Sequence, residues 1–400
     1  MKKIYYGQAT YDSKEIKACL NVLKNQSLSL MTGKNVKKLE KKIADIFGKK
    51  YALMVNSGSS ANLLAIQSLN LKKNSEVITP TLTFSTTISP IYQSGLIPNF
   101  VDVEKKTFVV NVKQIERQIN KNTKILMIPN LIGNIANWKE IKKIANKYKL
   151  TTIEDSADTI GYTLNGKNTG NLSDIVTNSF YASHVVSGAG FGGVVCFNNK
   201  NNYLRAKLLR GWGRSSALFN EDEDFKKRFG KKLSGIKYDS KYIFEEFGYN
   251  FLPSEISAAF ALEQIKKLKN NLVLRNRNFL YLKNFFIRNN IFFEVPEKNE
   301  NIKTGWLAFP LLIKKNKFFD RTDLQIFLEK NNIQTRTVFT GNILKQPIMK
   351  NQKYKKHKES EINSTDIMTR GMLLGCHQGL SLNDLDQVIN TIKKFINSIK

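Results

Sequence analysis

Polar and aromatic side chains follow directly after several short apolar runs of the sequence, and these side chains are the candidates for chemistry. Gly58 and Ser59 come after one such run and open a helical pattern. The free backbone N–H groups and the dipole of a helix start make an anion site, and glycine lets the anion approach closely. Charge-assisted bonds there are worth roughly 1.5–3 kcal/mol each. A plain capping loop explains the same residues equally well.

Two further run ends offer an aromatic ring and a pair of carboxylates. Phe84 comes just past a predicted strand, where a ring can stack on a flat ligand, although an isolated phenylalanine also fits the core. Asp155 and Asp158 follow the apolar lead of another strand. A buried carboxylate needs a partner, and a protonated pyridine nitrogen would supply one. The alternatives for Asp155 are a metal ligand or a helix cap.

The segment from Asn178 to Gly193 places a histidine before a glycine-rich turn. Ser179 lies near the end of a strand pattern, and its hydroxyl can donate to phosphate. His184 is one of three histidines in the chain. A lone histidine is more often structural, but the glycine-dense loop and the neighbouring strand ends favour function here. Imidazole titrates near neutral pH and can act as a proton-transfer base.

The elements that must position these residues alternate between strand and helix from Leu39 to Phe197. The predicted strands are Tyr51–Val55, Glu76–Thr79, Pro98–Val103, Lys124–Ile128, Thr151–Glu154, Ile175–Phe180 and Gly193–Phe197. Amphipathic helices are predicted at Ser60–Leu71, Val112–Ile119 and Trp138–Tyr148. This alternation indicates an α/β fold with a mainly parallel sheet. Ligands of such sheets bind at the carboxyl ends of the strands.

The character of the sequence changes after Lys200. A polar segment, 220–241, is followed by Asn250, ordinarily a turn residue, and by a helix predicted at Ser254–Lys267. Strands at Ile291–Val295 and Gly305–Ile313 then mix with helices at Thr322–Lys330 and Asp384–Ile399. We therefore predict a large α/β domain over residues 1–250 and a smaller α+β domain over residues 251–400.

Composition limits the classes of function. The longest apolar stretches are too short to cross a bilayer, and the start has no signal-peptide pattern, so we expect a cytoplasmic protein with no membrane partner. Cys19, Cys196 and Cys376 lie far apart and cannot supply the four thiolates of an iron–sulfur cluster. We expect no metal and no cluster.

The net charge of +30 needs a separate explanation. Its basic residues are spread over the whole chain, without a basic tail or a basic block interleaved with aromatics. We therefore expect no nucleic-acid partner. The positive field would still favour a small anionic substrate such as a nucleoside diphosphate.

In their order and spacing, these segments resemble the DegT/DnrJ/EryC1/StrS group of nucleotide-sugar aminotransferases, which have the type I fold of pyridoxal-phosphate enzymes. The resemblance runs from Met31-Thr32-Gly33 to the C-terminus. It implies that Phe84 stacks on the cofactor ring and that Asp155 pairs with the ring nitrogen, with Asp158 close by. It also implies a shared dimeric site, because Asn250 would reach the phosphate of the neighbouring subunit. The residues implied to hold the phosphate within one chain are Gly58, Ser59 and Ser179.

His184 is the departure from the family that decides the predicted function. Aminotransferases of the family have a lysine there, because only a primary amine can form the Schiff base. Lys200 lies too far along the chain to replace it. A histidine at this position marks the 3-dehydratase branch. Three other segments of the sequence are similar to that branch: Arg210–Arg214, Gln334–Arg336 and Phe339–Pro347. The scattered cysteines favour the iron-free, colitose-pathway kind over the kind with a two-iron cluster.

The resemblance therefore implies a 3-dehydratase that uses pyridoxamine 5′-phosphate or pyridoxal 5′-phosphate. Its substrate would be a nucleotide-linked 4-keto-6-deoxy sugar, with L-glutamate restoring the amine form of the cofactor. His184 would move the protons, and Asp155 would keep the ring an electron sink. Arg336 and Asn342 are the substrate-binding candidates. Arg336 could grip a carboxylate or a diphosphate by its forked geometry, although a plain surface arginine is the alternative.

A second departure concerns the glycine-rich loop after His184. The usual Gly-Glu-Gly-Gly is replaced by residues 188–193, with Phe191 nearest the place of the missing glutamate. This leaves the identity of the substrate open. The alternative functions are an aminotransferase that recruits another lysine, such as Lys167, and a silent relative that binds a nucleotide sugar without turning it over.

Overall fold

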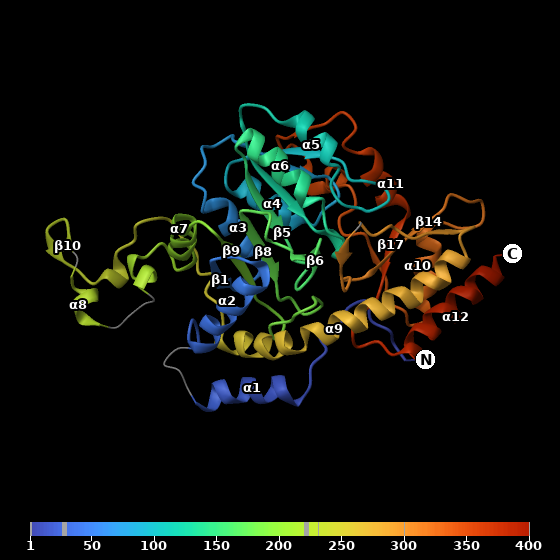
Figure 1. Cartoon of the computed structure of the whole chain (residues 1–400), viewed down its shortest axis with the longest axis horizontal. Coiled ribbons are helices and arrows are strands. Elements are labelled where there is room, and N and C mark those ends of the chain that lie inside the picture. The colour runs from blue at the N-terminus through green and yellow to red at the C-terminus, as the bar shows by residue number, and fades with distance from the viewer. Residues whose placement is uncertain (1, 26–29, 220–223, 231, 300, 400) are drawn as a thin grey trace.

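The protein, described here by a computed structural model, is built around one large mixed sheet (Figure 1). The structure describes residues 2–25, 30–219, 224–230, 232–299 and 301–399. Within these residues the sheet has eight strands, and β9 runs antiparallel to both of its neighbours. The other pairs are parallel. In spatial order the strands are β1 (Tyr51–Val55), β9 (Gly193–Phe197), β8 (Ile175–Ser179), β5 (Thr151–Asp155), β4 (Thr123–Pro129), β2 (Glu76–Pro80), β3 (Ile97–Val101) and β16 (Lys355–Lys356).

The predicted α/β fold class is confirmed, and the seven strands predicted between Tyr51 and Phe197 have bounds within two residues of the observed ones. Their sequences are continuous apolar runs because helices cover both faces of the sheet. Along β1, Ala52 and Met54 enter one core while Leu53 and Val55 enter the other. One face is covered by α2 (Lys34–Phe47), α5 (Val112–Gln118), α6 (Trp138–Tyr148) and the start of α9; the other by α3 (Gly58–Gln67), α4 (Ser85–Gln93) and α7 (Lys200–Arg210).

A long helix, α9 (Glu255–Arg288), connects the large sheet to a smaller unit (Figure 1). The sequence predicted that it would end at Lys267. It continues because its apolar positions first fill the large core, at Leu268, and then the second core, at Leu282 and Phe286. Since α9 belongs to both cores, the division at residues 250/251 stays a prediction.

The smaller unit contains an antiparallel sheet, in the order β12-β14-β17-β15. Its strands are β12 (Phe293–Glu294), β14 (Phe309–Ile313), β17 (Gly371–Leu374) and β15 (Arg336–Thr337). Its helices are α10 (Arg321–Lys330), α11 (Ile362–Arg370) and α12 (Leu382–Ser398). The strand expected from Gly305 begins only at Phe309, because the backbone turns at Trp306, where φ is 52°.

Two segments lie outside these layers. The N-terminal helix α1 (Ser13–Lys24) packs along α9. The segment with α8 (Phe225–Arg228), β10 (Lys232–Leu233) and β11 (Ile236–Lys237) projects from the body, at the left of Figure 1. In the part of the chain that the structure describes, no helix combines the length and apolar character needed to cross a membrane.

Candidate active site

The carboxyl ends of β2, β5 and β8 meet at one edge of the sheet, and the candidate residues collect there. Gly58 begins α3 and faces Ser179, the last residue of β8. A Cβ atom added to Gly58 would lie 2.7 Å from the Cβ of Ser179, so only glycine lets the two segments approach this closely. Gly193, at the start of β9, is also close to the backbone of Ser57: a Cβ atom added to Gly193 would lie 2.4 Å from the carbonyl carbon of Ser57.

This close approach forms a cradle with unused hydrogen-bond donors. Ser57 caps α3 by accepting from the N–H of Ser60 at 3.1 Å, so the amides of Gly58 and Ser59 point out of the helix start. Ser59 is exposed, and the hydroxyl of Ser179 accepts from the N–H of Tyr181 at 3.3 Å, which leaves its own proton to donate. The helix expected at Ser60 begins earlier because Ser57 supplies this cap. The cradle suits a phosphate group.

Asp155 lies at the carboxyl end of β5 and is held by neutral donors. Its Oδ2 accepts from the side chains of Asn62 and Thr87, each at 2.9 Å, and its Oδ1 accepts from the N–H of Ala157 at 3.2 Å. Burial raises the pKa of this carboxyl, against the lowering by Asn62 and Thr87. None of its partners among the described residues is a cation. A protonated ring nitrogen is the group that would complete this site.

Phe84 presents its ring to the same edge. It lies between β2 and α4 and is 51% exposed, which is unusual for a phenylalanine at a strand end. Among the described residues its ring contacts one other aromatic ring, that of Phe339, edge to face at 6.1 Å between centroids. One face of the ring is therefore open for stacking.

His184 lies in a short loop whose two ends are held by backbone hydrogen bonds. Phe180 donates to the carbonyl of Gly192 at 2.9 Å, and Gly188 donates to the carbonyl of Phe180 at 2.8 Å. Val185, next to the histidine, is buried in the core and anchors the turn. The imidazole Nδ1 lies 2.7 Å from the carbonyl oxygen of Ala157. Because a carbonyl only accepts, Nδ1 carries the proton and Nε2 keeps its lone pair.

Burial favours the neutral forms of His184 and Asp158, the two groups of the site that can exchange protons. Burial, opposed by the bond to Ala157 and assisted by the guanidinium of Arg275, lowers the pKa of His184 to about 4. Burial also raises the pKa of Asp158 to about 7, although the N–H of Ile132 donates to its Oδ2 at 2.8 Å. The base form of His184 is thus present at neutral pH, beside an acid that titrates there.

The remaining predicted residues lie in other surroundings. Asn250 is exposed and lies just before α9, where Gly211 pairs with it. Arg336 is exposed on β15. Asn342 is fully buried, and its amide donates to Glu361 at 2.9 Å and to Thr365 at 3.0 Å, so the fold already uses this side chain. Lys167, the alternative amine, is exposed in the β6 (Thr163–Leu164) and β7 (Lys167–Asn168) hairpin, which pairs with β13 (Ile302–Lys303).

Several contributing residues were missed in the sequence. Asn62 and Thr87 lie inside helices, and no local pattern shows that their side chains point at Asp155. Thr177 extends this network, since its hydroxyl donates to Asn62 at 2.6 Å. The backbone of Ala157 binds both Asp155 and His184. Asp155 ends β5 and His184 follows the end of the neighbouring strand, β8, which pairs with β5 in parallel; this succession of strand ends is the signal that could have suggested the shared contact.

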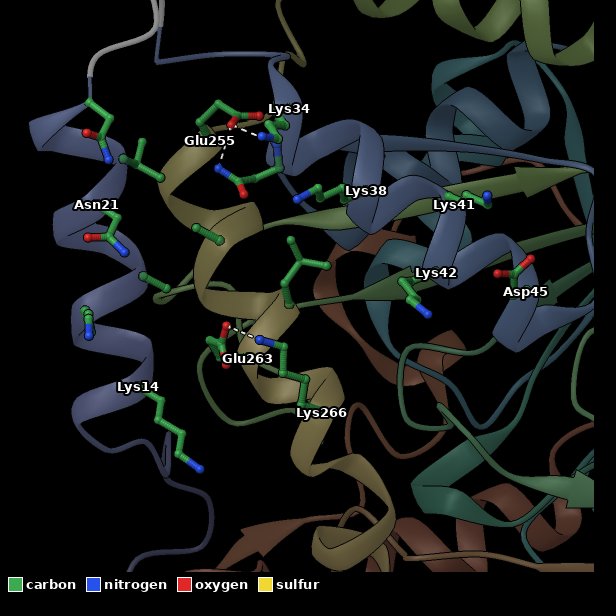
Figure 2. A pocket seen from close by; sticks show the side chains of 17 residues that line it. Lys14, Asn21, Lys34, Lys38, Lys41, Lys42, Asp45, Glu255, Glu263 and Lys266 are labelled. Carbon is green, nitrogen blue, oxygen red and sulfur yellow. Dashed lines mark hydrogen bonds and ion pairs between the residues drawn. The ribbon is translucent and has the colours of Figure 1, made fainter.

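A hollow of about 930 Å³ lies elsewhere, between α1, α2 and α9 (Figure 2). The carboxylate of Glu255, in this hollow, accepts hydrogen bonds from the backbone N–H groups of Asn35 and Val36. These N–H groups lie in the first turn of α2, so Glu255 caps the start of that helix. The basic side chains that line it are Lys14, Lys17, Lys34, Lys38, Lys41, Lys42 and Lys266. It contains none of the predicted site residues, so we do not assign the chemistry to it.

Comparison with known proteins agrees with this geometry. The profile of the DegT/DnrJ/EryC1/StrS aminotransferase family matches residues 9–393, and the chain belongs to that family. The lipopolysaccharide biosynthesis protein RfbH of Salmonella typhimurium is 35% identical over 378 residues, which are 92% of this chain and 86% of that protein. The GDP-4-keto-6-deoxy-D-mannose 3-dehydratase of Escherichia coli O55:H7 is 31% identical over 402 residues, 97% of this chain and 98% of that protein.

The fold matches that of a solved 3-dehydratase. A crystal structure of GDP-4-keto-6-deoxymannose-3-dehydratase with a trapped PLP-glutamate geminal diamine superposes with a TM-score of 0.85. It shares 29% identity, and the match covers 97% of this chain and 99% of that one. The predicted type I fold of pyridoxal-phosphate enzymes and the predicted family are therefore confirmed.

Proposed function

We propose that this protein removes the C3 hydroxyl of a nucleotide-linked 4-keto-6-deoxy sugar, with pyridoxamine 5′-phosphate as cofactor and L-glutamate restoring the amine form. Family membership and the full-length match to the Escherichia coli 3-dehydratase support this reaction. The observation that carries it is His184, whose Nδ1 is fixed by Ala157 at 2.7 Å. An imidazole held in this way can move protons but cannot form a covalent bond to the cofactor aldehyde.

The site residues fit the cofactor. The buried carboxylate of Asp155 has only neutral partners among the described residues, and a protonated pyridine nitrogen would complete it. Phe84 offers an open ring face, and the helix start at Gly58 and Ser59 with the hydroxyl of Ser179 would hold the phosphate. When bound, the cofactor supplies an electron sink for breaking the bond to the C3 oxygen.

The chain's own groups would divide the proton chemistry. Nε2 of His184 would take up the proton that the reaction removes from carbon, and the resulting imidazolium would pass it to the departing C3 hydroxyl, which leaves as water. Asp158 stands close to Asp155, and its pKa of about 7 lets it hold or release a proton under the same conditions. Its N–H contact from Ile132 fixes the carboxyl in place. Asp155 itself would stay ionised beside the ring nitrogen, because that cation offsets the burial that raises the pKa of Asp155.

We further propose a homodimer in which the partner's copy completes the site. Asn250 is exposed in this chain, with its side chain available to a neighbouring subunit. Exposed aromatic side chains on the projecting segment and on the stretch between it and α9 support such an interface: Phe225 is 68% exposed, Tyr242 62%, Phe244 59% and Phe247 104%. Exposed aromatic groups of this density mark interaction surfaces. Sedimentation of the purified protein should give a dimer, and a monomer would contradict this proposal.

The experiment that tests the reaction is mass spectrometry of the product. The purified protein, loaded with pyridoxamine 5′-phosphate, is incubated with a panel of 4-keto-6-deoxy sugars linked to different nucleotides, with glutamate present. We expect one substrate to yield a 3-deoxy sugar with loss of water and release of ammonia. An amino sugar as the product would contradict the proposal and would assign the protein to the aminotransferases.

A further inference from the structure

The N-terminal segment from Ile4 to Gly7 runs as a strap between the smaller unit and the loop of His184. Ile4 donates to the carbonyl of Asn332, and its own carbonyl accepts from Gln334, both at 2.8 Å. The carbonyl of Tyr5 accepts from Nε2 of His377 at 3.2 Å. At the other end, a Cβ atom added to Gly7 would lie 2.8 Å from the Cβ of Ser183. The strap therefore borders the active site.

Tyr6 is the strap residue that faces inward. Its backbone N–H donates to Oε1 of Gln334 at 3.1 Å, which fixes its position along the strap. Its ring is half-buried and packs on the cluster that includes Leu131 and Ile132, beside the residue that binds Asp158. Burial and the nearby charge of Asp158 both raise the pKa of Tyr6. The ring thus stands in the wall next to the acid that the reaction uses.

Arg336 also lies next to this ring. Its guanidinium carbon is 5.6 Å from the centroid of Tyr6, within the range of a cation–π contact. One nitrogen, Nη1, donates to the carbonyl of Thr335 at 2.7 Å. Among the described residues, no carboxylate lies within ion-pair distance of Arg336. The guanidinium is therefore oriented from two sides while its charge remains uncompensated.

We propose that Tyr6 and Arg336 form an anion clamp at the mouth of the active site, in which the ring of Tyr6 positions the guanidinium and Arg336 binds the anionic group of a reactant. The clamp deepens the proposed function and rests on it. Its ligand is an anion that accepts two hydrogen bonds, which is the chemistry that a guanidinium fork recognises. The carboxylate of glutamate and the diphosphate of the nucleotide sugar both have this chemistry. Tyr6 is a positioning residue here, because it acts through Arg336.

The test compares dissociation constants by calorimetry with two probes, L-glutamate and guanosine diphosphate, on the cofactor-loaded protein. For Tyr6→Leu we expect binding of one probe to weaken by about two- to fivefold, the range of a cation–π contact. The probe that responds identifies the source of the anion. The responding probe stands for one reactant, either glutamate or the nucleotide sugar. In the half-reaction that consumes this reactant, its KM should rise by the same factor while kcat stays unchanged, because Tyr6 does not touch the reacting atoms.

Two matched controls separate the ring from the strap. Tyr6→Phe keeps the aromatic face and should bind both probes like the unaltered protein. Tyr5→Leu changes an exposed neighbour on the same strap and should also have no effect. If Tyr6→Phe weakens binding as much as Tyr6→Leu, the hydroxyl rather than the ring is responsible, and the clamp is refuted.

A double-mutant cycle tests whether Tyr6 acts through Arg336. Arg336→Ala should weaken binding of the same probe by about tenfold or more. Adding Tyr6→Leu to Arg336→Ala should then cause no further loss. An equal loss in both backgrounds, or no loss for either probe, would overturn the proposal. These binding data are independent of product analysis, so failure to form a 3-deoxy sugar would defeat the proposed function and leave the clamp to be judged by binding alone.

Discussion

The Nδ1 atom of His184 lies 2.7 Å from the carbonyl oxygen of Ala157, and this contact decides which tautomer the site holds. The N–H of the same alanine donates to Asp155 at 3.2 Å. One residue of the backbone therefore orients both the base and the carboxylate that would face the cofactor. Because the carbonyl fixes the proton on Nδ1, the free lone pair on Nε2 points away from the backbone and is available to a ligand.

The first prediction concerns the pH dependence of proton transfer by His184. Burial lowers the pKa of His184 to about 4, so its neutral form is present at pH 7 and is lost only as the pH falls through about 4. We expect the single-turnover rate to have its acid limb near that pH. The measurement is the rate of dehydration across the acid range, with circular dichroism at each pH to confirm folding. An acid limb near the ordinary histidine value of 6.5 that persists in Asp158→Asn, which removes the group with a pKa of about 7, would contradict the geometry.

The same shift predicts a contribution of His184 to stability. Between the folded pKa of about 4 and the unfolded value of 6.5, the unfolded chain binds more protons at His184 than the folded chain. The free energy of unfolding should therefore rise with pH across this window, and the contribution of His184 should be complete above 6.5. The free energy of unfolding, measured by urea unfolding at several pH values, should rise less steeply with pH in His184→Asn than in the unaltered protein. Equal slopes would show that His184 is not the group responsible.

The second prediction tests the absence of a covalent anchor. Borohydride should not attach the cofactor to the unaltered protein, because imidazole offers no primary amine. His184→Lys places an amine at the end of the same pinned loop, so borohydride should then trap the cofactor on residue 184 and dehydration should be lost. Mass spectrometry of the tryptic peptides locates the attachment. Trapping on Lys167 in the unaltered protein would revive the aminotransferase alternative.

The third prediction concerns Asp155 as the partner of the ring nitrogen. Asp155→Asn removes the charge that would pair with the ring, and breaking a buried ion pair costs about 3–5 kcal/mol. We expect cofactor affinity to fall by about two to four orders of magnitude by that principle. Absorbance titration of the stripped protein measures it.

Thr87→Val is the matched control for Asp155. It removes one neutral hydrogen bond to the same carboxylate, so the expected loss is only about 0.5–1.5 kcal/mol. If the two variants lose the same affinity, the charge of Asp155 has no special role.

The sequence was sufficient to predict much of this site, for a physical reason. Buried strands appear as continuous apolar runs, and the ends of parallel strands must meet at one edge, so Phe84, Asp155 and Ser179 could be expected together. Asn62 could not, because an interior helical residue shows nothing of the direction of its side chain. The contact of Tyr6 with Arg336 joins residues 330 positions apart in the sequence, and no local pattern carries such information.

The fourth prediction tests the cradle formed by Gly58 and Ser179. Gly58→Ala introduces a Cβ atom 2.7 Å from the Cβ of Ser179, which is closer than two carbon atoms can pack. Either the helix start or the serine must move, at a cost of about 1–3 kcal/mol. We expect weaker binding of the cofactor phosphate, measured by absorbance titration with the phosphorylated cofactor and with its form lacking phosphate.

The matched compensation is Ser179→Gly in the Gly58→Ala background, which removes the clashing Cβ atom. The double variant should recover the folding stability lost in Gly58→Ala, as measured by urea unfolding. Its affinity for phosphate should still remain below that of the unaltered protein, because the hydroxyl donor of Ser179 is gone. Since the cofactor lacking phosphate does not use the cradle, its affinity should be the same for the double variant and the unaltered protein. Recovery of full phosphate affinity in the double variant would show that Ser179 does not bind the phosphate.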